Sequence, residues 1–98
     1  MRIQNKLMQQ RPSLDVDFFN ASDNFKQLKQ EYILQGKLED SGASFSDDNL
    51  TKTWTLTYST EEDYLSFKDE IYTREYMNQM YEYNQANKIS FSVEQHNI

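Results

Sequence analysis

The 98-residue chain contains no cysteine, one proline, two glycines and one histidine. The lack of cysteine excludes a disulfide framework, a thiolate zinc site and a cysteine nucleophile. Because Gly36 and Gly42 are the only glycines, there is no glycine-rich phosphate loop and no glycine-flanked nucleophilic serine. His96 lies two residues from the C-terminus with no neighbouring ligand or catalytic partner. We therefore predict no catalytic, cofactor-binding or metal-binding residue, and enzymatic activity is not favoured.

Long apolar runs are also missing. No stretch is apolar over enough residues to span a bilayer, and residues 1–10 lack the apolar segment of a secretory signal. The absence of cysteine fits a reducing compartment. We therefore expect a soluble, cytoplasmic protein without a membrane partner, and at this length a single domain.

Basic residues are fewer than acidic ones, 10 against 16, which gives a net charge of −6. The first 11 residues carry Arg2, Lys6 and Arg11 without an acid, so this segment is +3. The remainder has 7 bases and 16 acids and is therefore −9. An acidic body repels a phosphate backbone, so we expect no nucleic-acid binding through it. We interpret residues 1–11 as a basic partner-binding arm or an edge strand.

The clearest secondary structure is predicted at residues 51–59. Trp54, Leu56 and Tyr58 alternate with hydroxyl residues, and Lys52 occupies the first position of the same even-numbered series. Successive side chains on a strand point to opposite faces, so this pattern predicts a strand with one apolar and one polar face.

A long helix is predicted over residues 61–87. Ser59 and Glu62 match a capping box, and acids in the first turn suit the positive end of the helix dipole. The apolar positions of the second half are rotated relative to those of the first. This drift predicts a bend near Thr73 or two helices end to end, with Asn87 in the left-handed cap conformation.

The first strand of the core is predicted upstream, where Leu14, Val16 and Phe18 alternate with Asp15 and Asp17. Two carboxylates on one strand face suit either a bound cation or an acid–base pair. A solvated strand face is the favoured interpretation, because carboxylates are seldom buried.

The remaining elements follow from local signals. Ser22 is a natural helix cap and Gly36 a natural stop, which predicts a helix between them. Residues 37–45 predict a weaker strand with a bulge at Gly42. Alternation over residues 89–94 predicts the last strand.

The resulting order is strand, helix, strand, strand, helix, strand. It predicts an α+β protein with the ferredoxin-like β-α-β-β-α-β arrangement, built from residues 12–98. Its four-stranded antiparallel sheet carries two helices on one face and leaves the other face bare. The side chains expected on the bare face are mostly hydroxyls and carboxylates, which suits water or a polar interface.

The order of elements, and the aromatic strand that runs into Ser-Thr-Glu-Glu-Asp-Tyr at residues 59–64, resemble the dimeric α/β-barrel proteins, including the antibiotic-biosynthesis-monooxygenase-like group. The resemblance covers residues 14–93 in topology. It implies sheet-to-sheet dimerisation and, in some members, a pocket between sheet and helices. No histidine lies near Trp54 in the pattern, and the family's catalytic or haem-ligating residues have no match.

The chain also resembles small uncharacterised proteins of tailed phages that infect marine cyanobacteria. Such proteins are short, acidic, free of cysteine and rich in Asn, Gln and Tyr, and the Arg-Pro-Ser-Leu-Asp-Val-Asp-Phe-Phe run at residues 11–19 adds to the likeness. This resemblance implies the cytoplasm of a host cell, or the virion, as the location.

The second half of the predicted long helix is rich in Tyr and Met, which are enriched at protein interfaces. Part of this set packs in the core, and we expect the rest, notably Tyr76 and Tyr83, to form an exposed patch. The candidate partner-binding residues are Tyr72, Tyr76, Met77, Met80, Tyr83, Arg2, Lys6 and Arg11.

Three functions remain open, and the first is favoured. It is a non-catalytic interaction or assembly module, such as a phage accessory or virion protein, that forms a homodimer or binds another protein through the bare sheet face or the Tyr/Met-rich helix. The second is a small enzyme or ligand-binding protein of the dimeric barrel type, with Trp54, Tyr58 and Tyr64 lining a pocket. The third is an acidic inhibitor of a basic host protein, based on acids at residues 47–48 and 61–63.

Overall fold

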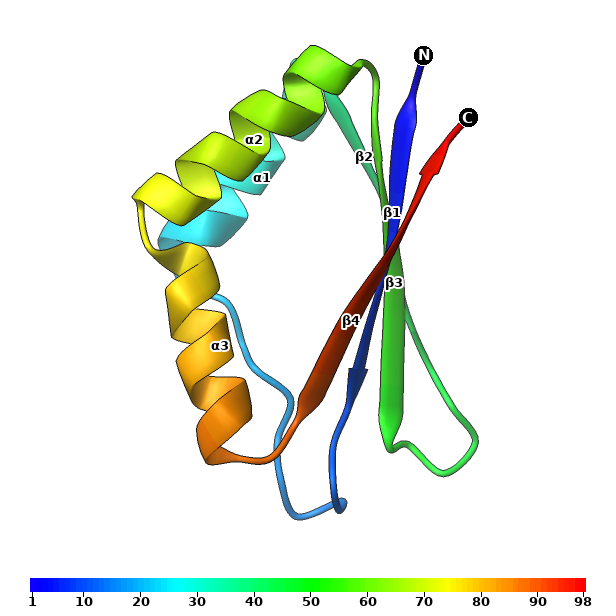
Figure 1. The fold of residues 1–98 in the computed structure, drawn as a ribbon, viewed down its shortest axis with the longest axis vertical. Coiled ribbons are helices and arrows are strands. Elements are labelled where there is room, and N and C mark those ends of the chain that lie inside the picture. The colour runs from blue at the N-terminus through cyan, green and yellow to red at the C-terminus, as the bar shows by residue number, and fades with distance from the viewer.

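The computed structural model describes residues 1–98 and shows a four-stranded antiparallel sheet with helices on one face only (Figure 1). The elements are β1 (Ile3–Gln10), α1 (Asp23–Leu34), β2 (Leu38–Phe45), β3 (Thr51–Tyr58), α2 (Glu61–Thr73), α3 (Tyr76–Ala86) and β4 (Ser90–Asn97). The strand order is β2-β3-β1-β4, so the predicted ferredoxin-like α+β fold is confirmed. None of the helices has the length and apolar character needed to cross a membrane.

The first strand lies earlier in the chain than predicted. β1 pairs with β3 on one side and β4 on the other, so residues 3–10 form a central strand, neither an arm nor an edge. The predicted strand around Asp15 and Asp17 is wrong, because residues 11–20 form an irregular connection. Asp15 and Asp17 therefore do not share a strand face, and the cation or acid–base interpretation loses its geometry.

Arg11 fixes this connection to the turn between β2 and β3. Its guanidinium donates hydrogen bonds to the backbone oxygens of Asn49 (2.7 and 2.9 Å) and Val16 (3.0 Å). The same group lies 4.5 Å from the centre of the Phe18 ring. Of the apolar side chains that suggested a strand, Phe18 packs against Arg11 and Phe45, whereas Leu14 is 60 % exposed.

The ends of the helices follow local signals, with small shifts. Ser22 caps α1 by accepting a hydrogen bond from the Phe25 amide, as predicted. The cap of α2 is Thr60, one residue after the predicted Ser59, and it accepts from the Asp63 amide at 3.1 Å. The Ser59 hydroxyl instead donates to the Gly36 carbonyl and ties the start of α2 to the end of α1.

The predicted bend in the long helix is confirmed. α2 ends at Thr73, and Glu75 adopts a left-handed conformation with φ of 64° before α3 begins. The left-handed residue after α3 is Lys88 (φ 57°), one position beyond the predicted Asn87. A left-handed residue redirects the chain, so α3 takes a different direction from α2 (Figure 1).

Both glycines lie where the chain needs a positive φ. Gly36 (φ 73°) ends α1 and leads into β2, as predicted. Gly42 (φ 82°) lies in a bulge between Asp40 and Ala43, where the register of β2 against β3 shifts. The predicted bulge is therefore confirmed.

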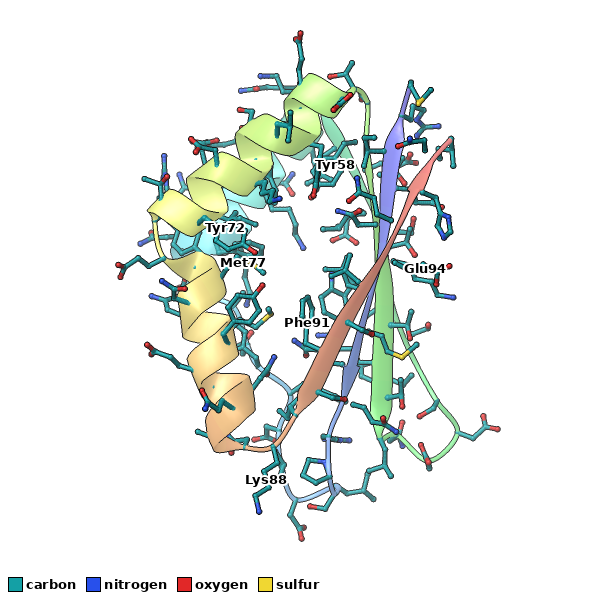
Figure 2. All side chains as sticks on the ribbon, in the orientation of Figure 1. Tyr58, Tyr72, Met77, Lys88, Phe91 and Glu94 are labelled. Carbon is teal, nitrogen blue, oxygen red and sulfur yellow. The ribbon has the colours of Figure 1, made fainter.

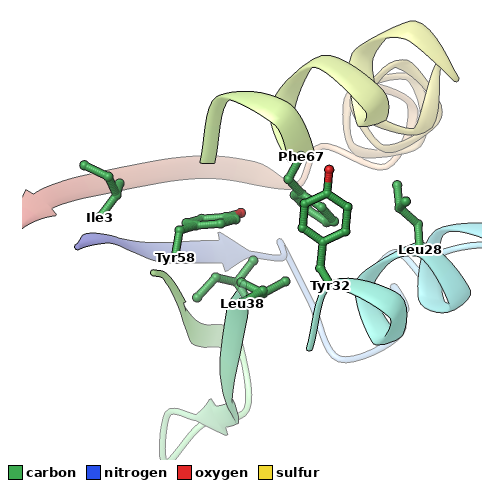
Figure 3. Packing of buried hydrophobic residues seen from close by; sticks show 7 residues of the cluster. Ile3, Leu28, Tyr32, Leu38, Tyr58 and Phe67 are labelled. Atoms are coloured by element: carbon green, nitrogen blue, oxygen red, sulfur yellow. The ribbon is translucent and has the colours of Figure 1, made fainter. Parts of the chain in front are cut away.

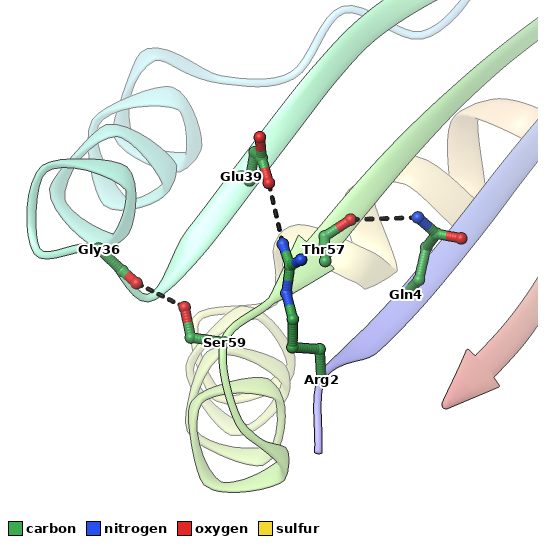
Figure 4. A network of polar contacts seen from close by, with 6 residues as sticks. All are labelled: Arg2, Gln4, Gly36, Glu39, Thr57 and Ser59. Carbon is green, nitrogen blue, oxygen red and sulfur yellow. Dashed lines mark hydrogen bonds and ion pairs between the residues drawn. The ribbon is translucent and has the colours of Figure 1, made fainter. Parts of the chain in front are cut away.

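The face of the sheet away from the helices is polar. Thr53, Thr55 and Thr57 alternate with the inward Trp54 and Leu56 on β3, as predicted. Polar and charged side chains contact one another across this face, and Figure 4 shows two such contacts. Gln4 Nε2 on β1 donates to Thr57 Oγ1 on β3 at 3.4 Å, and Arg2 reaches over β3 to form an ion pair with Glu39 of β2 at 3.0 Å.

The packed core occupies one end of the molecule, where β1 begins and α1 and α2 lie over the sheet (Figure 3). Only 13 of the 98 residues are buried, so a large part of the inner sheet face is not packed. The cluster consists of Ile3, Leu28, Tyr32, Leu38, Leu56, Tyr58 and Phe67. Within it, the Tyr32 hydroxyl joins α1 to α2 by hydrogen bonds to Ser66 (2.7 Å) and Glu70 (2.6 Å).

Tyr58 in this core should make the protein sensitive to alkaline pH. Its side chain is almost fully buried, and burial raises its pKa well above the ordinary value of 10.0. A raised pKa means that the folded state retains the proton that the unfolded chain releases. Tyr58 therefore stabilises the fold fully below pH 10, and this contribution is lost as the pH rises further.

We expect the free energy of unfolding, measured by urea titration at a series of pH values, to decline above about pH 10. The decline should be less steep in Tyr58→Phe, which has no phenol to ionise. Parallel declines in the two proteins would contradict this role of Tyr58.

Candidate functional site

Beyond the packed core, the helices and the sheet enclose a cleft of about 510 Å³. Figure 2 shows Phe91 projecting from β4 towards the helices, while Tyr72 and Met77 project from α2 and α3 towards the sheet. Most of the residues that line the cleft are apolar or aromatic. The volume lies within the range of small-molecule sites, about 300–1,000 Å³.

The sheet supplies an aromatic floor. The register places Leu7 of β1 beside Trp54 of β3 and Val93 of β4, and all three side chains line the cleft. The centres of the Trp54 and Phe91 rings are 6.4 Å apart. Trp54 is the only tryptophan of the chain, so its fluorescence reports directly on this floor.

The three aromatic residues predicted to line a pocket do line this cleft. Trp54, Tyr58 and Tyr64 all contribute to its wall. Tyr58 and Tyr64 pack with their ring centres 5.2 Å apart at the boundary between cleft and core. The sequence identified them because alternation on the strand and helical spacing placed them on facing surfaces.

Most of the Tyr/Met-rich set lines the cleft, although Tyr72 is also 44 % exposed to solvent. Tyr72, Tyr76, Met77 and Met80 all line the cleft. Tyr72 and Tyr81 form a hydrogen bond between their hydroxyl groups (3.1 Å), and burial together with this bond raises the pKa of Tyr81 to about 12. The break at residues 74–75 separates α3 from α2, so the two helices form different parts of one wall.

The two residues expected to form an exposed patch are half-buried. Tyr76 packs against Phe25 with the ring centres 5.7 Å apart. Tyr83 donates a hydrogen bond to the Asp17 carbonyl (2.7 Å), and its ring centre lies 5.5 Å from that of Phe19. Tyr83 thus holds the connection between β1 and α1, and a partner-binding role for this set stays a prediction.

Two buried amides on the cleft floor have no hydrogen-bond partner for their side-chain oxygens. Asn5 and Gln9 of β1 are 7 % and 2 % exposed, line the cleft, and have unpaired Oδ1 and Oε1 atoms. Asn84 on α3 is also buried and unpaired but does not line the cleft. An unmade hydrogen bond of this kind costs about 1–3 kcal/mol. Sequence reasoning missed both floor residues, whose only signal is that they lie an even number of residues from Ile3 and therefore share its face of the strand.

Lysines gather at one edge of the cleft. Lys26 and Lys29 come from α1 and Lys52 from β3, and Asp40 of β2 is the only carboxylate lining the cleft. A fourth lining lysine, Lys68, lies away from this edge on α2, with its ammonium nitrogen 5.8 Å from the centre of the Tyr64 ring. Lys29 forms an ion pair with Asp40 at 2.8 Å. Burial would raise the pKa of Asp40, but hydrogen bonds from Lys29 and the Gly42 amide hold it below its usual value.

Lys52 takes no part in an ion pair. Its ammonium nitrogen lies 5.3 Å from the centre of the Trp54 ring. Burial, and then the positive charge of Lys29, lower the pKa of Lys52. The edge therefore holds more positive charge than its own residues neutralise.

The basic residues proposed for partner binding lie elsewhere. Arg2 and Lys6 are on the open sheet face, where Lys6 is the register partner of Thr55 and Glu94. Arg11 holds the connection after β1. None of the three lines the cleft, and their role with a partner stays a prediction.

The acidic groups do not form a site. The acids at residues 47–48 and at 61–63 lie at opposite ends of β3, so they do not make the spaced double row that a nucleic-acid mimic requires (Figure 1). No three side chains of the types that hold metal ions come together. The Nε2 atom of His96 lies 2.7 Å from the Oε1 atom of Glu94 on the open sheet face, and His96 does not line the cleft.

Searches against protein-family models, curated proteins and solved structures found no match to this chain. The likeness to dimeric α/β-barrel proteins therefore remains a prediction that is carried by the order of the elements. The likeness to phage proteins remains a prediction as well.

Proposed function

We propose that the protein binds a small, largely apolar molecule with aromatic character in the cleft between the sheet and the helices. The observation that carries this proposal is the pair of unpaired, buried side-chain oxygens of Asn5 and Gln9 on an otherwise aromatic floor. Specific small-molecule sites combine apolar walls with a few polar groups that orient the ligand. A bound molecule with an N–H or O–H group would satisfy these oxygens.

The position of the Tyr/Met-rich segment supports ligand binding over an interaction module based on that segment. Aromatic and Met side chains from α2 and α3 converge on the cleft together with Trp54 and Phe91 of the sheet. Met adapts its shape to irregular apolar partners.

Binding can be tested with N-phenyl-naphthylamine, a neutral aromatic dye that fluoresces strongly when it leaves water. We expect saturable binding of one dye per chain, with an affinity in the micromolar range. Phe91→Ala should weaken it about tenfold, because the Phe91 ring is part of the aromatic floor.

Phe45→Ala is the matched control. Phe45 is 54 % exposed and does not line the cleft, so this change should leave dye affinity unaltered. Equal weakening in the two variants, or no saturable binding to the wild-type protein, would overturn the proposal.

We propose, second, that the protein forms a homodimer through its open sheet face. No helix covers this face, and its charges are balanced: Arg2 forms an ion pair with Glu39, and Lys6 is the register partner of Glu94. A polar surface with balanced charge can meet a copy of itself without like-charge repulsion.

Light scattering over a dilution series tests the dimer. We expect twice the monomer mass at high concentration and dissociation on dilution. Thr55→Arg, in the middle of the face on β3, should shift the protein to monomer. A monomer at every concentration would remove this second proposal and leave the first in place.

A further inference from the structure

The charge of the cleft edge is opposite to that of the protein. The chain carries −6 in total, yet three lysines and a single carboxylate meet at the edge formed by α1, β2 and β3, a net charge of +2. The lysines come from segments that are distant in the sequence, so the fold is what assembles them. Local positive charge of this kind attracts anions to a cleft even when the whole protein is acidic.

Lys52 stands out within this group. It occupies the inner face of β3, in the same alternating series as Trp54, Leu56 and Tyr58. No carboxylate lies within ion-pair distance of its ammonium group, although Lys26 and Lys29 are close enough to affect its ionisation. A partly buried ammonium among other cations is stabilised by an incoming negative charge.

Lys52 is also the neighbour of the most buried unpaired amide. The register pairs Gln9 directly with Lys52, so a hydrogen-bond acceptor and an unpaired cation lie side by side on the floor. The aromatic series continues from this point along the strand to Trp54 and Leu56. The cleft floor thus offers a polar site for one end of a ligand and, next to it along β3, an apolar surface for the rest of the ligand.

We propose that the ligand is an amphipathic monoanion, an aromatic or similarly flat apolar body that carries one carboxylate or equivalent group and an N–H or O–H donor for the Gln9 oxygen. The body lies on the aromatic floor at Trp54 and Phe91, and the anionic group binds Lys52 with support from Lys26. Lys29 is paired with Asp40, so the charge left over suits a single negative group better than a polyphosphate. This inference rests on the proposed binding function and names the class of its ligand.

A competing explanation is that the three lysines only keep their ammonium groups in water at the mouth of the cleft. Lys26 fits that explanation, since it is exposed and donates to Asn20 at 3.0 Å. The two explanations differ in what happens when Lys52 loses its charge. Only the ligand assignment predicts an effect that depends on the charge of the bound molecule.

The test compares two dyes that differ in a single charged group. N-phenyl-naphthylamine is neutral, and anilinonaphthalene sulfonate adds a sulfonate to the same skeleton. We expect Lys52→Gln to weaken the sulfonate dye about tenfold and to change the neutral dye by less than about twofold. The matched control is Lys6→Gln, on the opposite face of the sheet, which should alter neither affinity.

A competition experiment extends the test to carboxylates. Naphthoate should displace N-phenyl-naphthylamine from the wild-type protein at lower concentration than methyl naphthoate, its uncharged ester, which also lacks a hydrogen-bond donor. Lys52→Gln should remove that advantage. Circular dichroism shows whether Lys52→Gln folds. If it does not, Lys26→Gln should likewise weaken binding of the sulfonate dye more than binding of the neutral dye.

The outcomes separate the two proposals. Saturable binding of the neutral dye, with Lys52→Gln affecting both dyes equally or neither, would overturn the anionic ligand and leave the binding function standing. Binding of neither dye would overturn both. Selective loss of the sulfonate dye and of the naphthoate advantage would support the assignment.

Discussion

Replacing Phe67 by alanine should lower the free energy of unfolding by about 3–5 kcal/mol, the range for truncating a buried Phe. Phe67 is 1 % exposed and is the most deeply buried large side chain. Its ring centre lies 5.0 Å from that of Tyr32 on α1 and 5.9 Å from that of Tyr58 on β3. It therefore joins α1, α2 and the sheet in the one region that is fully packed.

Urea unfolding followed by circular dichroism measures this loss. Leu65→Ala on the same helix is the matched control, because Leu65 is 51 % exposed and should lose less than about 1 kcal/mol. Similar losses for Phe67→Ala and Leu65→Ala would show that the core is not centred on Phe67.

Gln9→Met should change stability and binding in opposite directions. The side-chain oxygen of Gln9 is buried without a hydrogen-bond partner. Methionine matches the length of glutamine but has no amide, so the substitution removes this unpaired oxygen. Its removal should raise the free energy of unfolding of the ligand-free protein by about 1–2 kcal/mol. Binding of a ligand that donates a hydrogen bond to this oxygen should weaken at the same time.

The comparison with Gln10→Met isolates the burial of the amide. Gln10 is the next residue of β1, but it is exposed on the other face of the sheet. We expect little change in stability and none in dye binding for that variant. A destabilised Gln9→Met would indicate that the Gln9 amide supports the fold and would weaken the argument for a ligand.

Most of the fold could be predicted because local signals agreed with the tertiary structure. Strict alternation marked the strand at Trp54, and helix caps and glycines marked the ends of several elements. Residues 1–11 were predicted as an arm or an edge strand and not as the central first strand, because Asn5 and Gln9 occupy core-facing positions and break the expected alternation of apolar and polar residues. Residues that break a local rule are often those of functional sites.

The cleft was predicted only in part. Trp54, Tyr58 and Tyr64 were expected to line a pocket because each lies on the apolar face of its element. The lysine edge was not foreseen, since Lys26 and Lys29 have outward-facing positions in the helical pattern. Helical spacing tells which face a residue occupies, but the distance between a helix and the sheet depends on tertiary packing.

The exposed Tyr patch was predicted for a similar reason. A continuous helix would carry aromatic residues around several faces, and some of them would then point to solvent. The break at Glu75 gives α2 and α3 separate directions, so that Tyr72, Met77 and Met80 can reach one cleft. The bend was predicted from the sequence, but its direction was not.

Quenching of Trp54 fluorescence during titration with N-phenyl-naphthylamine tests the central claim most directly, because Trp54 is the only tryptophan and lines the cleft. Our account predicts saturable quenching with a stoichiometry of one dye per chain, accompanied by energy transfer to the dye. Tryptophan emission that stays unchanged while the dye is titrated would contradict a binding cleft between the sheet and the helices.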